Sequence, residues 1–198
     1  MDKPDESAFD AFVFSQRGTL LALPAIALAA LGKPSAFSIA LGLPIAFIGE
    51  AVRCWAVGYS GVTTRGDHLE APALVTAGPY AHVRNPLYVG NFITALGFSI
   101  AFTGKNRGAA RAALVGGSLA TMLGVYSVIV PHEERFLEAE FGEPFRRYLE
   151  DVPRIVPQLE VTGSKTGSYD IDVIGIAETR TFATFGAMLG ILALKALR

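Results

Sequence analysis

Long apolar runs alternate with short polar segments along this chain, and the charged residues avoid the apolar runs. A helix needs about 20 mainly apolar residues to cross a bilayer, so the pattern predicts an all-α polytopic membrane bundle of about five transmembrane helices. The first and last runs are short and need tilt or local thinning of the bilayer to span it. The runs are Thr19–Gly32, Ser35–Tyr59, Leu87–Thr103, Ala109–Val130 and Phe182–Leu197.

The composition agrees with this pattern. Hydrophobic residues make up 51% of the chain and charged residues 18%, against about 25% charged in soluble domains. The alternative for any one run is a buried helix of a soluble protein. Such helices are amphipathic, whereas these runs are apolar on all sides, so five of them disfavour that alternative. The formal net charge is −1, and no nucleic-acid partner is expected.

We expect one membrane domain over residues 1–198, with no repeat. Its core is 45–157, followed by a polar linker at 158–181 and a C-terminal span at 182–197. Residues 133–150 predict a helix, interrupted near Gly142–Pro144, that lies along the membrane surface.

The N-terminus is acidic ahead of the first apolar run, unlike the basic start of a signal peptide, so this run is expected to be a retained span. Cys54 is the single cysteine and lies in an apolar run, which favours a packing role.

The positive charges favour one orientation. Five spans place the N-terminus, the 60–86 loop and the 131–181 segment on one side, which holds ten Lys and Arg residues against six on the other, with Arg53 near the first side. The positive-inside rule makes the first side cytosolic. The ten are Lys3, Arg17, Arg65, Arg84, Arg135, Arg146, Arg147, Arg154, Lys165 and Arg180, and the six are Lys33, Lys105, Arg107, Arg111, Lys195 and Arg198.

A polar loop on that side carries candidate chemistry. Residues 74–90 read LVTAGPYAHVRNPLYVG, in which Gly78-Pro79-Tyr80 is a turn signal. Asn85-Pro86 predicts the start of the third span, with Asn85 as its N-cap. The free N–H groups and the dipole of that helix end favour an anion such as a carboxylate. The alternative is an ordinary capped helix start.

Charged and aromatic side chains flank this helix start. Arg84 suits a carboxylate as a bidentate partner, or it reaches lipid phosphates. Tyr80 and Tyr88 suit an adenine ring or a cation, or they anchor the chain at the interface. Glu133 and Glu134 follow the fourth apolar run, where the alternative is a solvated helix start.

Together these motifs resemble the isoprenylcysteine carboxyl methyltransferase family and its relatives, the phospholipid N-methyltransferases. That family carries Leu-Val-x-x-Gly-x-Tyr-x-x-x-Arg-His-Pro-x-Tyr-x-Gly and a later Glu-Glu, which form an S-adenosylmethionine site. The resemblance covers about residues 45–157. It implies that the cofactor is bound by Leu74, Val75, Tyr80, Asn85, Pro86, Leu87, Tyr88 and Glu133, while Arg84 orients a substrate carboxylate.

The chain departs from the family at the positions that concern the acceptor. Asn85 stands where the family usually has His, so a hydrogen-bonding role survives better than proton chemistry. Ser127–Val130 lacks the arginine that the eukaryotic prenylcysteine enzymes carry before the Glu pair, and the Gly-x-Gly of the phospholipid enzymes has no clear counterpart. The resemblance therefore assigns neither the prenylcysteine nor the phospholipid substrate to this chain.

The expected function is S-adenosylmethionine-dependent methylation of a lipid-like acceptor in the membrane, with the active site facing the cytosol. Carboxyl O-methylation of an isoprenylcysteine-like substrate is preferred because Arg84 offers a carboxylate partner. N-methylation of a phospholipid or other amine is the alternative, with Glu134 or His132 as base. A cofactor-binding or sensing protein without catalysis is the alternative of another class, and a transporter or scaffold is less favoured.

No metal site is expected. His68, His82 and His132 lack ligand spacing, and the His132-Glu133-Glu134 run lacks the second histidine of a zincin motif.

Overall fold

The computed structural model describes residues 8–61, 71–161 and 165–197, and within these ranges it is helical with no strand. His68 and several counted charges (Lys3, Arg65 and Arg198) lie outside them. The helices are α1 (Ala8–Leu31), α2 (Ala36–Ser60), the 3-10 helix η2 (Gly78–Ala81), α3 (Pro86–Phe102), α4 (Gly108–Phe141), α5 (Glu143–Asp151), α6 (Asp172–Ala177) and α7 (Thr179–Ala196).

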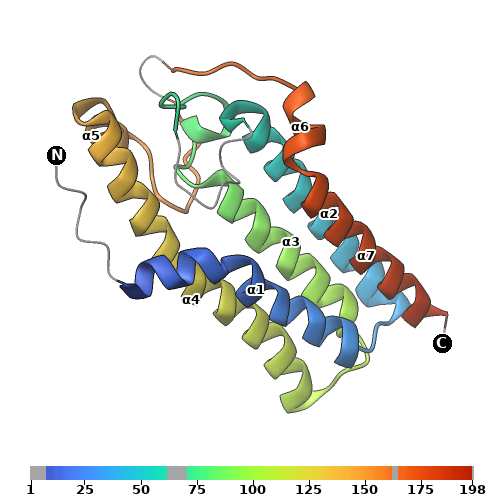
Figure 1. The fold of residues 1–198 in the computed structure, drawn as a ribbon. Coiled ribbons are helices and arrows are strands. Elements are labelled where there is room, and N and C mark those ends of the chain that lie inside the picture. Colours follow the sequence, from blue (N-terminus) through green and yellow to red (C-terminus); the bar gives the residue numbers. More distant parts are fainter. Residues whose placement is uncertain (1–7, 62–70, 162–164, 198) are drawn as a thin grey trace.

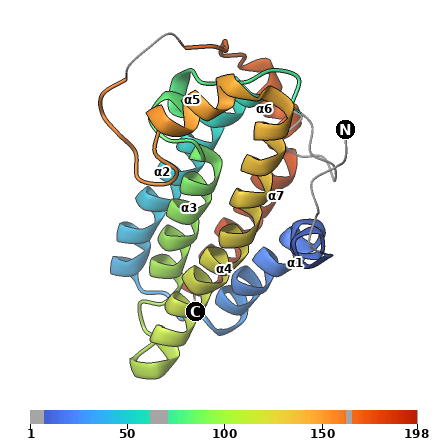
Figure 2. The same ribbon diagram turned by 90° about the vertical axis from the view of Figure 1, so that its left-hand side faces the viewer.

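The long helices form a bundle in which α3 lies between α2 and α4 and α1 lies across α4 (Figures 1 and 2). Helices α5 and α6 gather at one end, around η2 and the start of α3 (Figure 2). Helices α1, α2 and α4 are long and apolar enough to cross a membrane, and α3 is a shorter apolar helix. An all-helical membrane-type architecture therefore agrees with the sequence analysis.

Four glycines allow α2 and α3 to pack closely. Gly42 on α2 faces Gly97 on α3, and Gly49 faces Gly90. The two glycines on each helix are seven residues apart, so they lie two turns apart on one face of that helix. A Cβ on Gly97 would lie 2.3 Å from the backbone nitrogen of Ala46. Small residues at such an interface let the backbones approach, which is how helices in lipid gain packing energy.

The first hairpin is closed by a buried amide. Asn106, in the α3–α4 loop, accepts a hydrogen bond from the Lys33 backbone N–H at 2.7 Å and donates to the Leu31 carbonyl at 3.1 Å. Ser35 and Ser38 form a capping box at the start of α2. This end of the bundle is thus fixed on the side opposite η2.

Helix α1 begins at Ala8, eleven residues before the predicted start at Thr19. The extra turns have a partner on α4, because Val13 and Phe14 pack in one cluster with Met122 and Tyr126. Tertiary packing, which the local hydropathy pattern does not contain, extends this helix.

Helix α4 runs through Pro131 without a break and ends at Gly142, whose φ of 58° is the left-handed conformation that glycine tolerates. The helix therefore continues past the predicted end of the fourth span at Val130, and Glu133 and Glu134 lie inside α4 and are not a helix start. Proline is tolerated inside membrane helices when neighbouring groups satisfy the freed carbonyl.

The predicted surface helix is divided between the end of α4 and α5. The apolar face of α5 packs on protein rather than lying free on lipid, because Phe145, Tyr148 and Val152 are buried together against Leu74 and Leu137. The polar linker predicted at 158–181 also contains α6 and the start of α7.

The glycine interface gives a first prediction. Gly97→Ala should destabilise the detergent-solubilised protein by about 1–3 kcal/mol, because the new methyl group meets backbone atoms of α2 that cannot move aside. Thermal unfolding followed by circular dichroism measures the effect. Gly116→Ala is the matched control, since a Cβ there meets nothing within 4 Å and alanine favours the helix. Equal melting temperatures for the two variants would contradict the close α2–α3 contact.

Candidate functional site

The loop before α3 is held by the chain that follows α5. Gly78 (φ 60°) opens the turn of η2. The Gln158 backbone N–H donates to the His82 carbonyl at 2.9 Å, and the Arg84 N–H donates to the Pro153 carbonyl at 2.9 Å. His82 Nδ1 also lies 2.8 Å from the Gln158 carbonyl oxygen. The loop therefore has backbone partners although it belongs to no regular element.

Residues 165–170 of the C-terminal segment, which we call the strap, also hold the loop. The backbone N–H groups of Thr76 and Ala77 donate to the Thr166 carbonyl at 2.9 and 3.0 Å, and the Asp170 N–H donates to the Gly58 carbonyl of α2 at 2.8 Å. Residues 165–170 thus join the loop to the end of α2.

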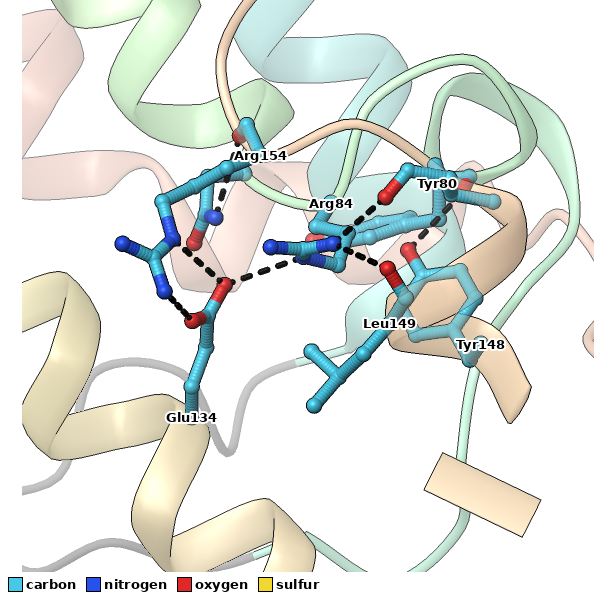
Figure 3. Close-up of polar contacts among 8 residues, drawn as sticks. Tyr80, Arg84, Glu134, Tyr148, Leu149 and Arg154 are labelled. Atoms are coloured by element: carbon cyan, nitrogen blue, oxygen red, sulfur yellow. Dashed lines mark hydrogen bonds and ion pairs between the residues drawn. The ribbon is translucent and has the colours of Figure 1, made fainter. Parts of the chain in front are cut away.

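Glu134 is clamped between two arginines (Figure 3). Arg84 Nε donates to Oε1 at 3.0 Å, and Arg154 reaches Oε1 at 3.2 Å and Oε2 at 2.5 Å. The Glu134 and Arg84 side chains are 10% and 12% exposed, so this ion pair is shielded from water. The clamp ties α4, the loop and the segment after α5 together.

Arg84 also closes the end of α5. Its Nη1 donates to the carbonyls of Leu149 and Val152 at 2.7 and 2.6 Å, where a cation complements the negative end of the helix dipole. The sequence suggested Arg84 as a partner for a substrate carboxylate. In the structure its Nε and Nη1 are engaged by the protein itself.

Asn85 occupies the N-cap position of α3 but makes no side-chain capping bond, so that part of the prediction is wrong. Its Nδ2 donates instead to the Arg154 carbonyl at 3.2 Å. The side chain points toward the segment that Arg154 anchors and therefore cannot turn back to the first turn of α3.

Glu133 and Glu134 are neighbours in sequence but face different partners. The Tyr88 hydroxyl donates a short hydrogen bond to Glu133 Oε1 at 2.6 Å. Consecutive residues on a helix point about 100° apart, so Glu133 faces α3 while Glu134 faces the loop.

Tyr80 is fixed through its backbone, because the Tyr148 hydroxyl donates to its carbonyl at 2.8 Å (Figure 3). Burial raises the pKa of the Tyr80 hydroxyl to about 12. The group therefore remains a neutral hydrogen-bonding phenol at neutral pH.

A cavity of about 1630 Å³ extends from this loop between the helices, and all nine residues predicted for the site line it. These are Leu74, Val75, Tyr80, Arg84, Asn85, Pro86, Leu87, Tyr88 and Glu133. Its other wall comes from α1, α2 and the segment around α6 and α7.

The wall also contains a cluster of polar side chains that the sequence did not predict to lie together. Arg53 donates through Nη2 to both oxygens of Glu178, at 3.0 and 2.8 Å, and through Nη1 to Asn91 Oδ1. Glu50 lies 3.7 Å from Arg53 Nε. Glu50, Arg53 and Asn91 stand out in the sequence as polar residues inside spans, but Glu178 is 125 residues from Arg53 and gives no local signal.

Three further residues were missed. Arg17 and Tyr126 line the cavity, and Arg154 holds Glu134. Arg17 is one of few charges near the first apolar run, which was its only sequence signal.

Two described histidines lie apart from one another. The His132 ring packs against Phe14 with centroids 5.4 Å apart, and His82 lies against Gln158. Among the described residues no group of three His, Cys, Asp or Glu side chains is placed to hold a metal ion.

Comparisons of the sequence with known proteins find two curated relatives. The chain is 35% identical over 97 residues to the protein-S-isoprenylcysteine O-methyltransferase of Schizosaccharomyces pombe, covering 46% of this chain and 34% of that protein. It is 31% identical over 121 residues to the cobalt-zinc-cadmium resistance protein CzcN of Cupriavidus metallidurans, covering 61% and 48%. The chain thus spans about a third to a half of these relatives. No solved structure matches.

The profile of the phospholipid methyltransferase family matches residues 37–144, a range that includes α2, α3, α4 and the loop with its Glu133–Tyr88 pair. The resemblance read from the loop and the Glu pair is therefore confirmed, and the chain belongs to the phospholipid methyltransferase family.

Proposed function

We propose that this protein is an S-adenosylmethionine-dependent methyltransferase that modifies a lipid-like acceptor in the membrane. One observation carries the proposal: nine positions chosen from sequence, separated by up to 59 residues, line the same cavity around the Glu133–Tyr88 pair. Family membership supports the methyltransferase class.

The lining suits this cofactor. The Glu133 carboxylate offers a partner for an ammonium group, and the Tyr80 and Tyr88 rings offer faces for an adenine or a sulfonium. The start of α3 at Pro86 favours a carboxylate. When bound, the cofactor supplies an electrophilic methyl group. The protein's own part is to hold both reactants in line and to exclude water.

We further propose that the acceptor group is a carboxylate, as in an isoprenylcysteine. The isoprenylcysteine relative supports this choice. A carboxylate is ionised at neutral pH and needs no base. An amine must first lose a proton, and Glu134, one of the two candidate bases, is held by two arginines. N-methylation is the second candidate, favoured by the description of the family.

In the membrane we propose one domain with five spans, formed by α1, α2, α3, α4 and α7. The loop before α3 and the 131–181 segment face the cytosol, where the cofactor is made. The support is the charge distribution, with ten Lys and Arg residues on that side against six on the other.

The methylated product separates the candidates. Membranes containing the protein are incubated with S-adenosylmethionine carrying a labelled methyl group, and the lipid extract is treated with base. A carboxyl methyl ester releases labelled methanol, whereas an N-methyl group does not. We expect base-labile label that depends on the protein. Base-stable label would establish N-methylation, and cofactor binding without label in lipid or protein would favour a sensing role.

The Glu pair gives a second prediction. Glu133→Gln should weaken S-adenosylhomocysteine binding by about 1.5–3 kcal/mol, the usual loss for a hydrogen bond to a charged group, as measured by calorimetric titration. Glu134→Gln is the matched control in the next residue. It should lower thermal stability, because it removes the charge between Arg84 and Arg154, and change affinity less. Equal small losses of affinity in both variants would remove Glu133 from the cofactor site.

Orientation gives a third prediction. In a Cys54→Ala background, cysteines replacing Glu150 and Arg107, both exposed, are treated with a membrane-impermeant maleimide in intact cells. Only the Arg107 position should react, because the proposed arrangement puts it outside. Permeabilised cells serve as the control for Glu150. Reaction at Glu150 in intact cells would overturn the cytosolic placement of the site.

A further inference from the structure

We propose that the segment after α5, residues 155–161, inserts into the headgroup region of the bilayer and anchors the loop before α3 at the membrane surface. Four of its seven residues are large apolar side chains that are exposed: Leu159 (93%), Val156 (77%), Ile155 and Val161. Single exposed apolar residues are common on protein surfaces. Several of them close together form a patch, and such a patch marks an interaction site.

The backbone of this segment is fixed, so its apolar side chains are held outward. The Gln158 N–H donates to the His82 carbonyl at 2.9 Å, and Gln158 Nε2 donates to the carbonyls of Ala81 and Asp151 at 3.3 and 3.1 Å. The polar Gln158 side chain thus turns toward the protein while Val156 and Leu159 turn away from it. This is the reverse of the arrangement expected for a segment that faces water.

The outer face of α2 identifies the partner as lipid. Leu41, Ile48 and Trp55 are spaced seven residues apart, so they form one stripe along the helix, and all three are exposed. Helix α2 is long and apolar enough to cross a membrane, so this stripe faces the acyl chains. It ends at Trp55, five residues before the end of α2, which is about 7.5 Å along the helix axis. Tryptophan is enriched at this depth, where the bilayer meets water.

The segment continues the stripe on α2. The rings of Trp55 and His82 have centroids 6.2 Å apart, and His82 Nδ1 lies 2.8 Å from the Gln158 carbonyl oxygen. In Figure 2 the segment projects from the η2 end of the bundle on the side of α2 and α3. Its exposed apolar side chains therefore begin beside an interfacial tryptophan, at the edge of the surface that lipid covers.

Apolar area rather than charge drives the insertion. The chain from Asp151 to Val161 carries two acidic residues and one arginine, and that arginine, Arg154, is paired with Glu134. Attraction to anionic lipids is therefore weak, and the partner is the bilayer interface itself. Because the segment is bonded to the loop before α3, its insertion holds that loop at the depth of the lipid headgroups. This inference concerns membrane contact and does not depend on the proposed transfer reaction.

Tryptophan fluorescence tests the insertion, because Trp55 is the single tryptophan of the chain. Leu159→Trp is made in a Trp55→Phe background and placed in nanodiscs of phosphatidylcholine whose acyl chains are brominated close to the headgroup. We expect its emission to be quenched as strongly as that of Trp55 in the wild type. Arg147→Trp in the same background is the matched control, since Arg147 is exposed on α5. Its emission should be quenched by aqueous iodide and not by the brominated lipid.

The two quenchers separate the possible surroundings of the segment. Quenching of Leu159→Trp by iodide alone would overturn the proposal, because the segment would then lie in water. Shielding from both quenchers would also overturn it, since a second copy of the chain would then cover the segment. Val156→Trp repeats the measurement at the other strongly exposed position and should be quenched by the brominated lipid. Adding phosphatidylserine should change nothing, and a requirement for this anionic lipid would overturn the apolar basis of the insertion.

Discussion

The ion-pair clamp on Glu134 is the interaction on which the rest of the site depends. Arg84 comes from the loop, Arg154 from the segment after α5, and Glu134 from the end of α4. Removing one partner of such a shielded pair leaves an uncompensated charge, which is strongly destabilising. Because the clamp fixes all three segments at once, it sets where α3 begins and where Tyr80, Asn85 and Tyr88 lie on the cavity wall.

A second buried ion pair fixes the opposite wall. Arg53 and Glu178 join α2 to the start of α7, and the strap from Thr166 to Thr76 joins the same C-terminal segment to the loop. The family profile covers residues 37–144, so Arg53 and Thr76 lie within it, whereas their partners Glu178 and Thr166 lie beyond it.

The two neighbouring glutamates illustrate how one motif performs two tasks. Glu134 forms ion pairs with Arg84 and Arg154 that hold the fold, while Glu133 accepts a hydrogen bond from a tyrosine hydroxyl on the cavity wall. The same division separates Arg84 from Arg53. The arginine in the sequence motif holds the loop, whereas the arginine outside the motif binds Glu178 and Asn91 on the cavity wall.

The sequence by itself determined the helical class, the limits of α2 and α3 to within a residue or two, and nine of the residues that line one cavity, because hydropathy, glycine–proline turns and the loop motif are local signals. It could not determine that α4 continues through Pro131, that Asn85 turns to Arg154 instead of capping α3, or that Arg84 binds Glu134 and Arg53 binds Glu178. The contacts of Asn85, Arg84 and Arg53 each join segments 50 or more residues apart. A buried charge or amide takes whichever partner packing brings within reach, so only the tertiary structure decides which one it is.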